Sequence, residues 1–97
     1  MGRKERSLDP TAPAAQLAQP LRELRLRAGL TYRELGRRAH FHHTVMWRAA
    51  GGRVVADWDV VEAFVLHCTP SSEPPPDLAF WRTLWTAARR TCGGETQ

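Results

Sequence analysis

Apolar residues recur along this chain at spacings of three and four, which is the period of an amphipathic helix. The first such run contains Pro20 and ends before Gly29, a residue suited to closing a helix. Because proline is tolerated in the first turn of a helix but costs about 3 kcal/mol or more in its interior, we expect the regular helix to begin near Gln19. The apolar face of this helix comprises Leu17, Leu21, Leu24 and Ala28.

Capping signals in the next segment predict two short helices joined by a turn at residues 39–42, which includes the last residue of the first helix. Thr31 followed by Glu34 forms a T-x-x-E capping box, which opens a helix over residues 32–39. His42 is placed to cap a second helix over residues 43–50, and a glycine pair then ends it. This order of signals is typical of a helix-turn-helix motif.

The second half of the chain carries two more helical patterns, separated by a Pro- and Ser-rich linker at residues 69–76. We expect Asp57 to cap a helix that ends near Cys68, and Asp77 to cap a last helix over residues 77–90. Their apolar positions are Trp58, Val61, Ala63, Phe64 and Val65 in the first helix, and Leu78, Trp81, Leu84, Trp85 and Ala88 in the second. The sequence has no strand-like alternation of useful length, so we predict an all-α fold.

A length of 97 residues fits a single domain with one modest core. We assign residues 15–90 to a helix-turn-helix domain whose motif spans about residues 31–51. Residues 1–14 are predicted to form a flexible basic tail, and residues 91–97 a frayed end. The chain has no glycine-rich phosphate loop, no nucleophile motif and no paired carboxylates in an apolar setting. We therefore predict that it is not an enzyme.

The charges are divided unevenly along the chain. Residues 1–53 contain 11 basic and 4 acidic residues, a net charge of +7, and this part includes the motif. Residues 54–97 contain 3 basic and 6 acidic residues, a net charge of −3. A localised basic surface is typical of nucleic-acid binding, because cations near phosphates release condensed counterions. Charge alone leaves two alternatives open, a nucleic-acid interface and a solvated basic surface.

In order and spacing these features closely resemble the lambda-repressor-like (Cro/Xre) helix-turn-helix domain. The resemblance runs from about Leu17 to Cys68. It rests on LRELRxRAGLTYREL at 21–35, the turn at 39–42, the Gly-Arg pair after the second motif helix and WxVVEAFV at 58–65. The resemblance implies a five-helix fold in which the second motif helix lies in the major groove of double-stranded DNA. It also implies a transcriptional regulator.

The resemblance and the residue chemistry together assign candidate DNA contacts. The expected base-reading residues on the outer side of the second motif helix are His42, His43, Thr44, Trp47 and Arg48. The expected contacts to the DNA backbone are Tyr32 by resemblance and Arg33, Arg37 and Arg53 by their charge. Arg48 is the best guanine reader by chemistry, because its guanidinium can bind two acceptors of that base at once.

Three residues depart from the pattern of the family. His40 stands where a glycine is usual in the turn, so it must adopt a left-handed or related backbone conformation. Trp47 stands where a small or polar residue is usual. Gly36 replaces an alanine inside the first motif helix, at a cost of about 1 kcal/mol in helix stability, but it permits close approach of the crossing helix.

These departures leave a second function open. The fold also suits a protein-interaction module, such as an adaptor, an antitoxin-like partner or an N-terminal signalling piece, which binds its protein partner through the Trp47 surface and binds DNA little or not at all. The last helix likewise has two interpretations. It either packs on the core or forms a homodimer surface, with Trp81, Leu84 and Trp85 as the candidate residues.

Other partners and sites are not implied by the sequence. Three histidines at 40, 42 and 43 diverge in direction and lack a second close pair with zinc-ligand spacing, so we predict no metal site. No cofactor or small-molecule ligand is indicated, and no segment has the length and apolarity of a membrane span. The cysteines form no dense framework, so we expect a cytoplasmic protein with reduced thiols. Charging of the histidines is expected to tighten DNA binding below about pH 6.5.

Overall fold

The structure is a computed structural model that describes residues 14–93. The predicted flexible tail lies outside this range except for Ala14, and so do residues 94–97 of the predicted frayed end. The described chain forms the helices α1 (Ala15–Ala28), α2 (Tyr32–Ala39), α3 (His43–Ala49), α4 (Trp58–Cys68) and α5 (Leu78–Gly93). Helices are the only regular elements within residues 14–93, which confirms the predicted all-α, five-helix fold.

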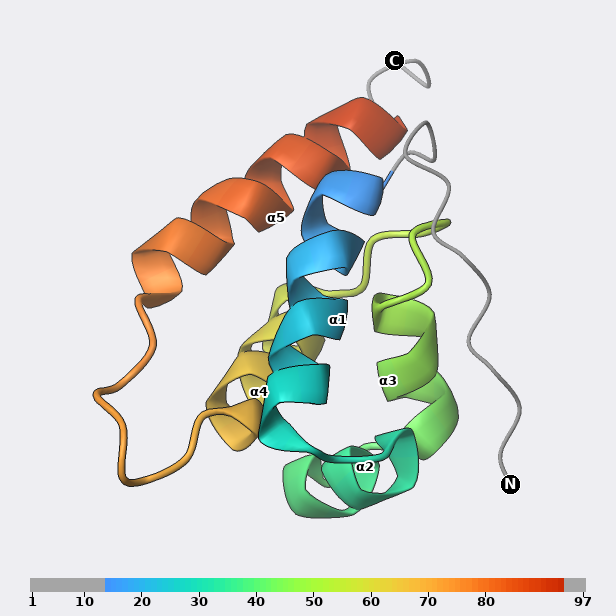
Figure 1. The fold of residues 1–97 in the computed structure, drawn as a ribbon. Coiled ribbons are helices and arrows are strands. Elements are labelled where there is room, and N and C mark those ends of the chain that lie inside the picture. Colours follow the sequence, from blue (N-terminus) through green and yellow to red (C-terminus); the bar gives the residue numbers. More distant parts are fainter. Residues whose placement is uncertain (1–13, 94–97) are drawn as a thin grey trace.

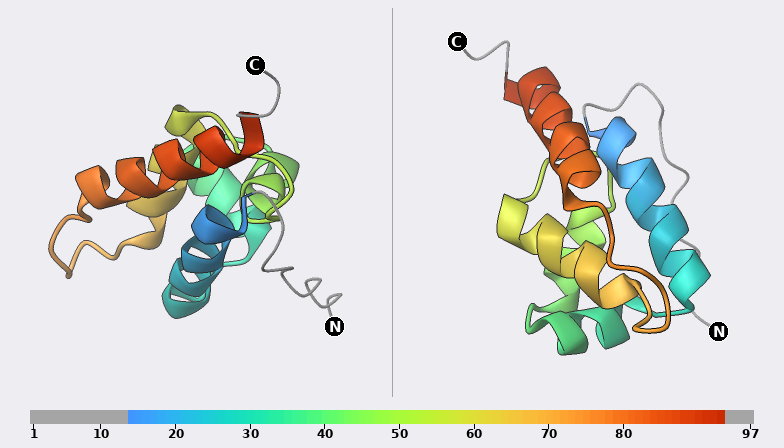
Figure 2. Two further views of the ribbon diagram at one scale, coloured as in Figure 1. Left: turned by 90° about the horizontal axis from the view of Figure 1, so that it is seen from above. Right: turned by 90° about the vertical axis from the view of Figure 1, so that its left-hand side faces the viewer.

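The five helices form two groups that share one core. Helices α1, α4 and α5 all contact one another, with α5 lying across the other two (Figures 1 and 2). Helices α2 and α3 contact each other closely and both also contact α4, so they form the opposite end of the molecule (Figure 1). The largest fully buried side chains are Phe64, Leu17, Leu21, Leu35, Met46, Val61 and Val65. Because these come from α1, α2, α3 and α4, the motif helices are fixed by the same core as the rest of the domain.

Helix α1 begins at Ala15, so the expected start near Gln19 is wrong. Pro20 lies in the second turn of the helix, where its missing N–H leaves one carbonyl of the first turn without its helical donor. Burial of the preceding turn offsets this loss. The buried residues before the proline are Ala15, Leu17 and Ala18. Gly29 then ends the helix in the left-handed conformation with φ 70°, as the sequence predicts.

Helix α2 begins with the predicted capping box. The backbone N–H of Glu34 donates to the Thr31 hydroxyl at 3.1 Å, and the Glu34 carboxylate accepts from the backbone N–H of Thr31 at 2.8 Å. These hydrogen bonds hold the pKa of the Glu34 carboxyl below its usual value. Leu30, just before the cap, and Leu35, one turn inside it, are both buried in the core. The start of α2 is therefore fixed by local hydrogen bonds and by burial on both sides of the cap.

The two later caps differ. Asp57 stands at the N-cap of α4 as predicted, but its side chain makes no capping hydrogen bond there. Asp77 accepts from the backbone N–H groups of Ala79 at 3.1 Å and Phe80 at 3.3 Å, and so caps α5. Helix α5 continues to Gly93, three residues beyond the predicted end at 90.

Candidate nucleic-acid interface

The turn between α2 and α3 depends on the backbone conformation of one residue, His40, and on the missing side chain of another, Gly36. His40 has φ 63° and ψ 35°, so it adopts the left-handed conformation that the sequence predicts for this position. The backbone N–H of Phe41 donates to the carbonyl of Gly36 at 3.0 Å. A Cβ atom on Gly36 would lie only 2.6 Å from the Phe41 carbonyl oxygen and 3.1 Å from the Cα of His43. The glycine therefore allows the chain to turn tightly and start α3 directly against α2.

Histidine caps the N-terminus of α3, as predicted. The backbone N–H of Thr44 donates to Nδ1 of His42 at 3.2 Å. As an acceptor this nitrogen is unprotonated, so in the neutral ring the proton is on Nε2, which is available to a partner outside. The ring of His43 stacks on that of His42 with centroids 4.4 Å apart. The two imidazoles therefore form one small aromatic surface at the start of α3.

None of the five candidate base-reading residues is buried in the core. His42, Trp47 and Arg48 are exposed, whereas His43 and Thr44 are half-buried. Trp47 retains 51% of its surface exposed, which confirms the prediction that it points outward. On the opposite side of α3 the buried residues are Met46 and Ala49, followed by Ala50. The helix thus has a polar and aromatic outer face of the kind that a groove-reading helix requires.

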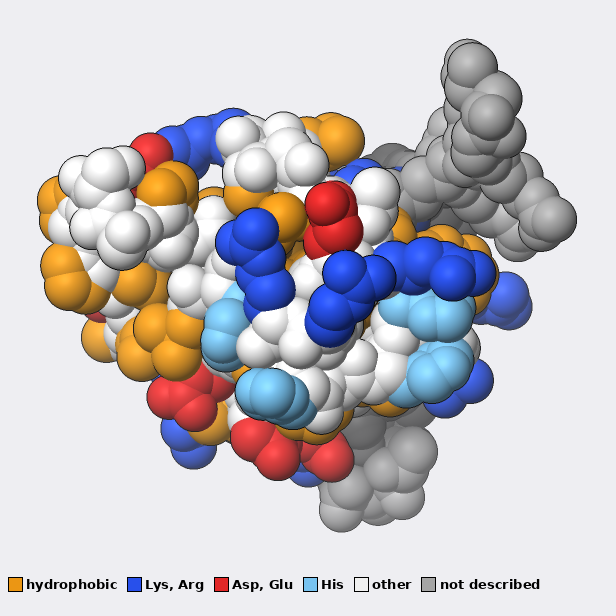
Figure 3. Space-filling model, turned by 90° about the horizontal axis from the view of Figure 1, so that it is seen from below, with side chains coloured by type: hydrophobic (Ala, Val, Ile, Leu, Met, Phe, Trp, Pro, Cys, Tyr) orange, Lys and Arg blue, Asp and Glu red, His pale blue; other side chains and the backbone are white. Residues whose placement is uncertain are grey.

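The candidate backbone contacts lie on α2 and on the segment that follows α3. Arg33, Arg37 and Arg53 are all exposed. Tyr32 is half-buried, and the guanidinium of Arg25 lies 4.3 Å from the centroid of its ring. Figure 3 shows the end of the molecule that carries α2, where arginine and histidine side chains gather across the middle of the face. The arrangement concentrates positive charge around α2 and α3, where residues 31–53 contain five arginines and one acidic residue.

The positive surroundings affect the histidine at the start of α3. Partial burial lowers the pKa of His43, and the neighbouring His42 and Arg33 lower it further. The free protein therefore keeps this imidazole neutral to a lower pH than an isolated histidine. An anion placed against the same surface would act in the opposite direction, because it stabilises the charged ring.

The candidate dimer residues of α5 contribute to this chain's own core. Trp81 is buried, and Leu84 and Trp85 are half-buried against the core. This agrees with the expectation that the last helix packs on the domain. A further role of the three residues in a homodimer remains a prediction.

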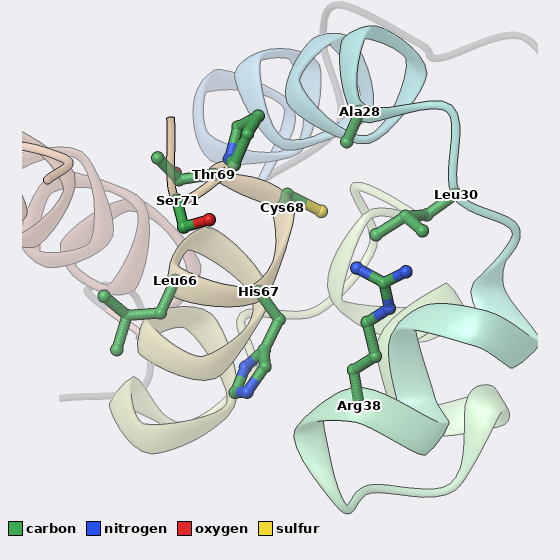
Figure 4. A pocket seen from close by; sticks show the side chains of 9 residues that line it. Ala28, Leu30, Arg38, Leu66, His67, Cys68, Thr69 and Ser71 are labelled. Carbon is green, nitrogen blue, oxygen red and sulfur yellow. The ribbon is translucent and has the colours of Figure 1, made fainter. Parts of the chain in front are cut away.

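A groove that the sequence does not indicate lies between α2, the end of α4 and the linker that follows. It is open to solvent, has a volume of about 380 Å³, and includes none of the candidate DNA contacts. Figure 4 shows the Arg38 side chain extending toward Leu30, with the sulfur of Cys68 pointing into the same space. His67 lines the groove as well, and burial, Arg38 and His40 together lower its pKa. The positive charge of the groove lining therefore comes from Arg38, because the lowered pKa of His67 favours its neutral ring.

The thiol in this groove is not a reactive one. Burial raises the pKa of Cys68 to about 11, so the thiolate that would act as nucleophile or metal ligand is scarce near neutral pH. Arg38 and the groove escape sequence reasoning because they depend on how α2 and α4 pack. The adjacent Arg37 and Arg38 look equivalent in the sequence.

Within the described residues, no group of three His, Cys, Asp or Glu side chains is arranged to hold a metal ion. None of the helices between residues 14 and 93 is both long and apolar enough to cross a membrane.

Comparison with known proteins identifies the family. A family model described as a helix-turn-helix domain matches residues 16–69, which is more than half of the chain. The chain therefore belongs to the helix-turn-helix domain family, consistent with the Cro/Xre-like resemblance of its sequence. Searches of curated proteins and of solved structures found no significant match. The matched segment covers α1 to α4 and ends before α5. Members of the helix-turn-helix domain family are typically DNA-binding regulators rather than enzymes.

Proposed function

We propose that this protein binds double-stranded DNA in a sequence-dependent manner and regulates transcription as an Xre-type regulator. In this proposal α3 enters the major groove, with His42, His43, Thr44, Trp47 and Arg48 facing the bases. The observation that carries the proposal is the outer face of α3, which presents polar and aromatic side chains opposite a fully buried inner face. The arginines around it supply the charge for attachment to phosphates.

The proposed mechanism separates attachment from discrimination. Arg33, Arg37 and Arg53 approach phosphates and give salt-dependent affinity without reading sequence. Arg48 binds a guanine edge through its two-pronged guanidinium, and Thr44 contacts a thymine methyl. Each good contact of this kind discriminates against a wrong base by about 1–3 kcal/mol. Occupancy of a promoter then blocks or recruits the transcription machinery.

The first test measures binding of random-sequence duplex DNA by fluorescence anisotropy at about 50 and 200 mM salt. If four arginines each displace one counterion, affinity falls on the order of a hundredfold between these salt concentrations. Selection and sequencing of the bound DNA is expected to enrich a defined motif. An inverted repeat with half-sites about one helical turn apart would also establish a dimer on DNA. Retention without enrichment would contradict sequence reading.

Arg48→Ala and Arg90→Ala form the matched pair for this test. Both arginines are exposed, but Arg90 lies near the end of α5 and not on the candidate interface. We expect Arg48→Ala to weaken binding of the selected motif and to relax the base preference at one position. Arg90→Ala is expected to bind as the unmodified protein does. Equal losses in both variants would show that general charge, rather than the α3 face, accounts for the binding.

The exposed Trp47 supports a second candidate function, a protein-interaction module. A tryptophan with half of its surface in solvent suits an anchor for a protein partner. In that case Arg48→Ala leaves DNA retention unchanged because there is little to lose, whereas Trp47→Ala abolishes capture of the partner. Absence of DNA binding even at low salt would favour this second function.

A further inference from the structure

The segment between α3 and α4 has no regular secondary structure, yet its backbone is held from outside. The backbone N–H of Ala14 donates to the carbonyl of Gly52 at 3.1 Å. The Nε of Arg22, on α1, donates to the carbonyl of Ala50 at 2.7 Å. The beginning of the segment is therefore hydrogen-bonded to the start and the middle of α1.

The end of the same segment is fastened to α5. The indole N–H of Trp85 donates to the carbonyl of Ala56 at 2.8 Å, across 29 positions of sequence. Trp85 is itself held in an aromatic and cationic cluster. Its ring lies 5.7 Å from that of Trp58, and the guanidinium groups of Arg82 and Arg89 each lie 5.0 Å from its centroid. A ring restrained in this way presents its N–H in one fixed direction.

Arg53 and Val54 lie between these fastened points and are both exposed. Gly52, directly before them, is buried and has φ 84°, a left-handed backbone conformation that glycine adopts without strain. The backbone is thus hydrogen-bonded at Gly52 and again at Ala56. Between these points Arg53 and Val54 are exposed to solvent, whereas Val55 is partly buried against the core. Of these, Arg53 is a candidate phosphate contact.

From this geometry we infer that Trp85 is a positioning residue for DNA binding. It anchors the segment at 50–57 to α5 and so fixes the place from which Arg53 approaches the DNA backbone. The functional unit therefore extends beyond the matched helix-turn-helix segment at 16–69 and includes α5. This inference rests on the proposed DNA-binding function for its consequence, but the anchoring itself can be measured without DNA.

The first measurement is trypsin cleavage after Arg53 in the full-length protein, compared with cleavage after Arg37 and Arg38 inside α2. Trp85→Phe removes the indole N–H and keeps an aromatic ring. We expect it to raise the relative rate of cleavage after Arg53 by about fivefold, the ratio that corresponds to one neutral hydrogen bond. The control is Trp58→Phe, because the Trp58 indole N–H donates to no residue in the described part of the chain. Trp58 belongs to the same cluster, and Trp58→Phe is expected to leave the rate of cleavage after Arg53, relative to cleavage after Arg37 and Arg38, unchanged.

The second measurement is the salt dependence of DNA binding in a double-mutant cycle. In the unmodified background, Arg53→Ala is expected to reduce the slope of log affinity against log salt by about 0.9, the loss of one phosphate contact. In the Trp85→Phe background the same change is expected to reduce the slope clearly less, because the arginine is no longer held in place. A residue that serves stability alone would not alter the effect of Arg53→Ala.

The outcomes separate the inference from the proposed function. Faster cleavage after Arg53 together with a diminished Arg53 effect supports the inference. Faster cleavage with an unchanged Arg53 effect overturns it, because the anchoring would then have no bearing on DNA. Unchanged cleavage in Trp85→Phe, or an equal rise at all three arginines, also overturns it. If the unmodified protein fails to bind DNA, the proposed function is overturned, and cleavage alone still decides whether Trp85 anchors the segment.

Discussion

Helices α3 and α5 both carry tryptophan close to arginine, but the two helices use these residues differently. On α3, Trp47 is half exposed and the adjacent Arg48 is exposed, and neither side chain makes a hydrogen bond or ion pair to another described residue. On α5, Trp85 donates a hydrogen bond and is covered by Arg82 and Arg89. The same residue types therefore form an exposed surface on α3 and, on α5, a contact that connects this helix to the segment before α4. The difference shows that residue composition alone does not identify a binding surface. A binding surface is identified by side chains that have no partner within the protein.

The largest test of this comparison exchanges one tryptophan on each helix for alanine. Trp81 is 8% exposed, so Trp81→Ala is expected to lower the free energy of unfolding by about 3–5 kcal/mol. Trp47→Ala removes an exposed ring and is expected to change it by less than about 0.5 kcal/mol. Urea unfolding of the two variants checks both values. A large loss in Trp47→Ala would show that α3 depends on this side chain for its fold.

The second test concerns how closely α3 approaches its neighbour. Gly36→Ala should favour the helix by about 1 kcal/mol through propensity alone. The added Cβ would meet the Phe41 carbonyl at 2.6 Å, and overpacking of this kind costs about 1–3 kcal/mol. We therefore expect net destabilisation in thermal unfolding, with weaker DNA binding. A more stable Gly36→Ala variant would show that the turn yields without cost.

The third test compares one arginine from each helix. Arg48→Ala is expected to weaken binding of a selected DNA motif by about 1–3 kcal/mol and to leave the stability almost unchanged. Arg82→Ala removes a cation that lies 4.9 Å from the ring centroid of Trp58 and 5.0 Å from that of Trp85. It is expected to lower stability by about 0.5–1 kcal/mol with little change in the DNA affinity. Anisotropy and urea unfolding on both variants measure the two effects. The comparison fails if the effects are interchanged.

The smallest expected effects come from pH. The pKa of His43 and that of His67 lie below the ordinary value of 6.5, so the unfolded chain binds protons first as pH falls. The free energy of unfolding is therefore expected to decrease from about pH 6.5 downward, and to stop changing once the folded protein is also protonated. DNA affinity is expected to rise over the same range, because phosphates favour a charged imidazole on α3.

A matched pair of variants separates these two effects of pH. His43→Gln should weaken the pH dependence of both stability and DNA affinity, since His43 lies on the candidate interface. His67→Gln should weaken only that of stability, since His67 lines the groove beside α4. Titrations at equal salt between about pH 8 and pH 5 test this. Flat DNA affinity across that range would exclude a role for charged histidine.

Much of the fold could be predicted because its signals are local. The capping box at Thr31, the histidine cap of α3 and the left-handed turn at His40 each depend on residues within a few positions, and the structure confirms all three. The predicted start of α1 was wrong because burial of the turn before Pro20 outweighs the local cost of a proline inside the helix. Burial depends on distant helices, which periodicity within one segment does not reveal.

The candidate site divides in the same way. The outward direction of Trp47 follows from its position on α3 relative to the buried Met46. The hydrogen bond from Trp85 to Ala56 has no local signal, since its partners are separated by 29 positions and the acceptor is a backbone carbonyl. The sequence could assign Trp85 to a core face or a dimer surface, but it could not show which atom the indole contacts.

The uneven exposure of the tryptophans also supplies two optical reporters in one unmodified chain. Trp47 is half exposed to water, so we expect its emission at longer wavelength and more open to quenching by iodide in solution. Trp58 and Trp85 are half-buried and Trp81 is buried, so we expect their emission to be quenched less by iodide. Protection from iodide on adding DNA or a protein partner would follow mainly the α3 surface, whereas the signal of the less exposed tryptophans would follow unfolding. Binding and unfolding can therefore be measured separately in the same sample without a label.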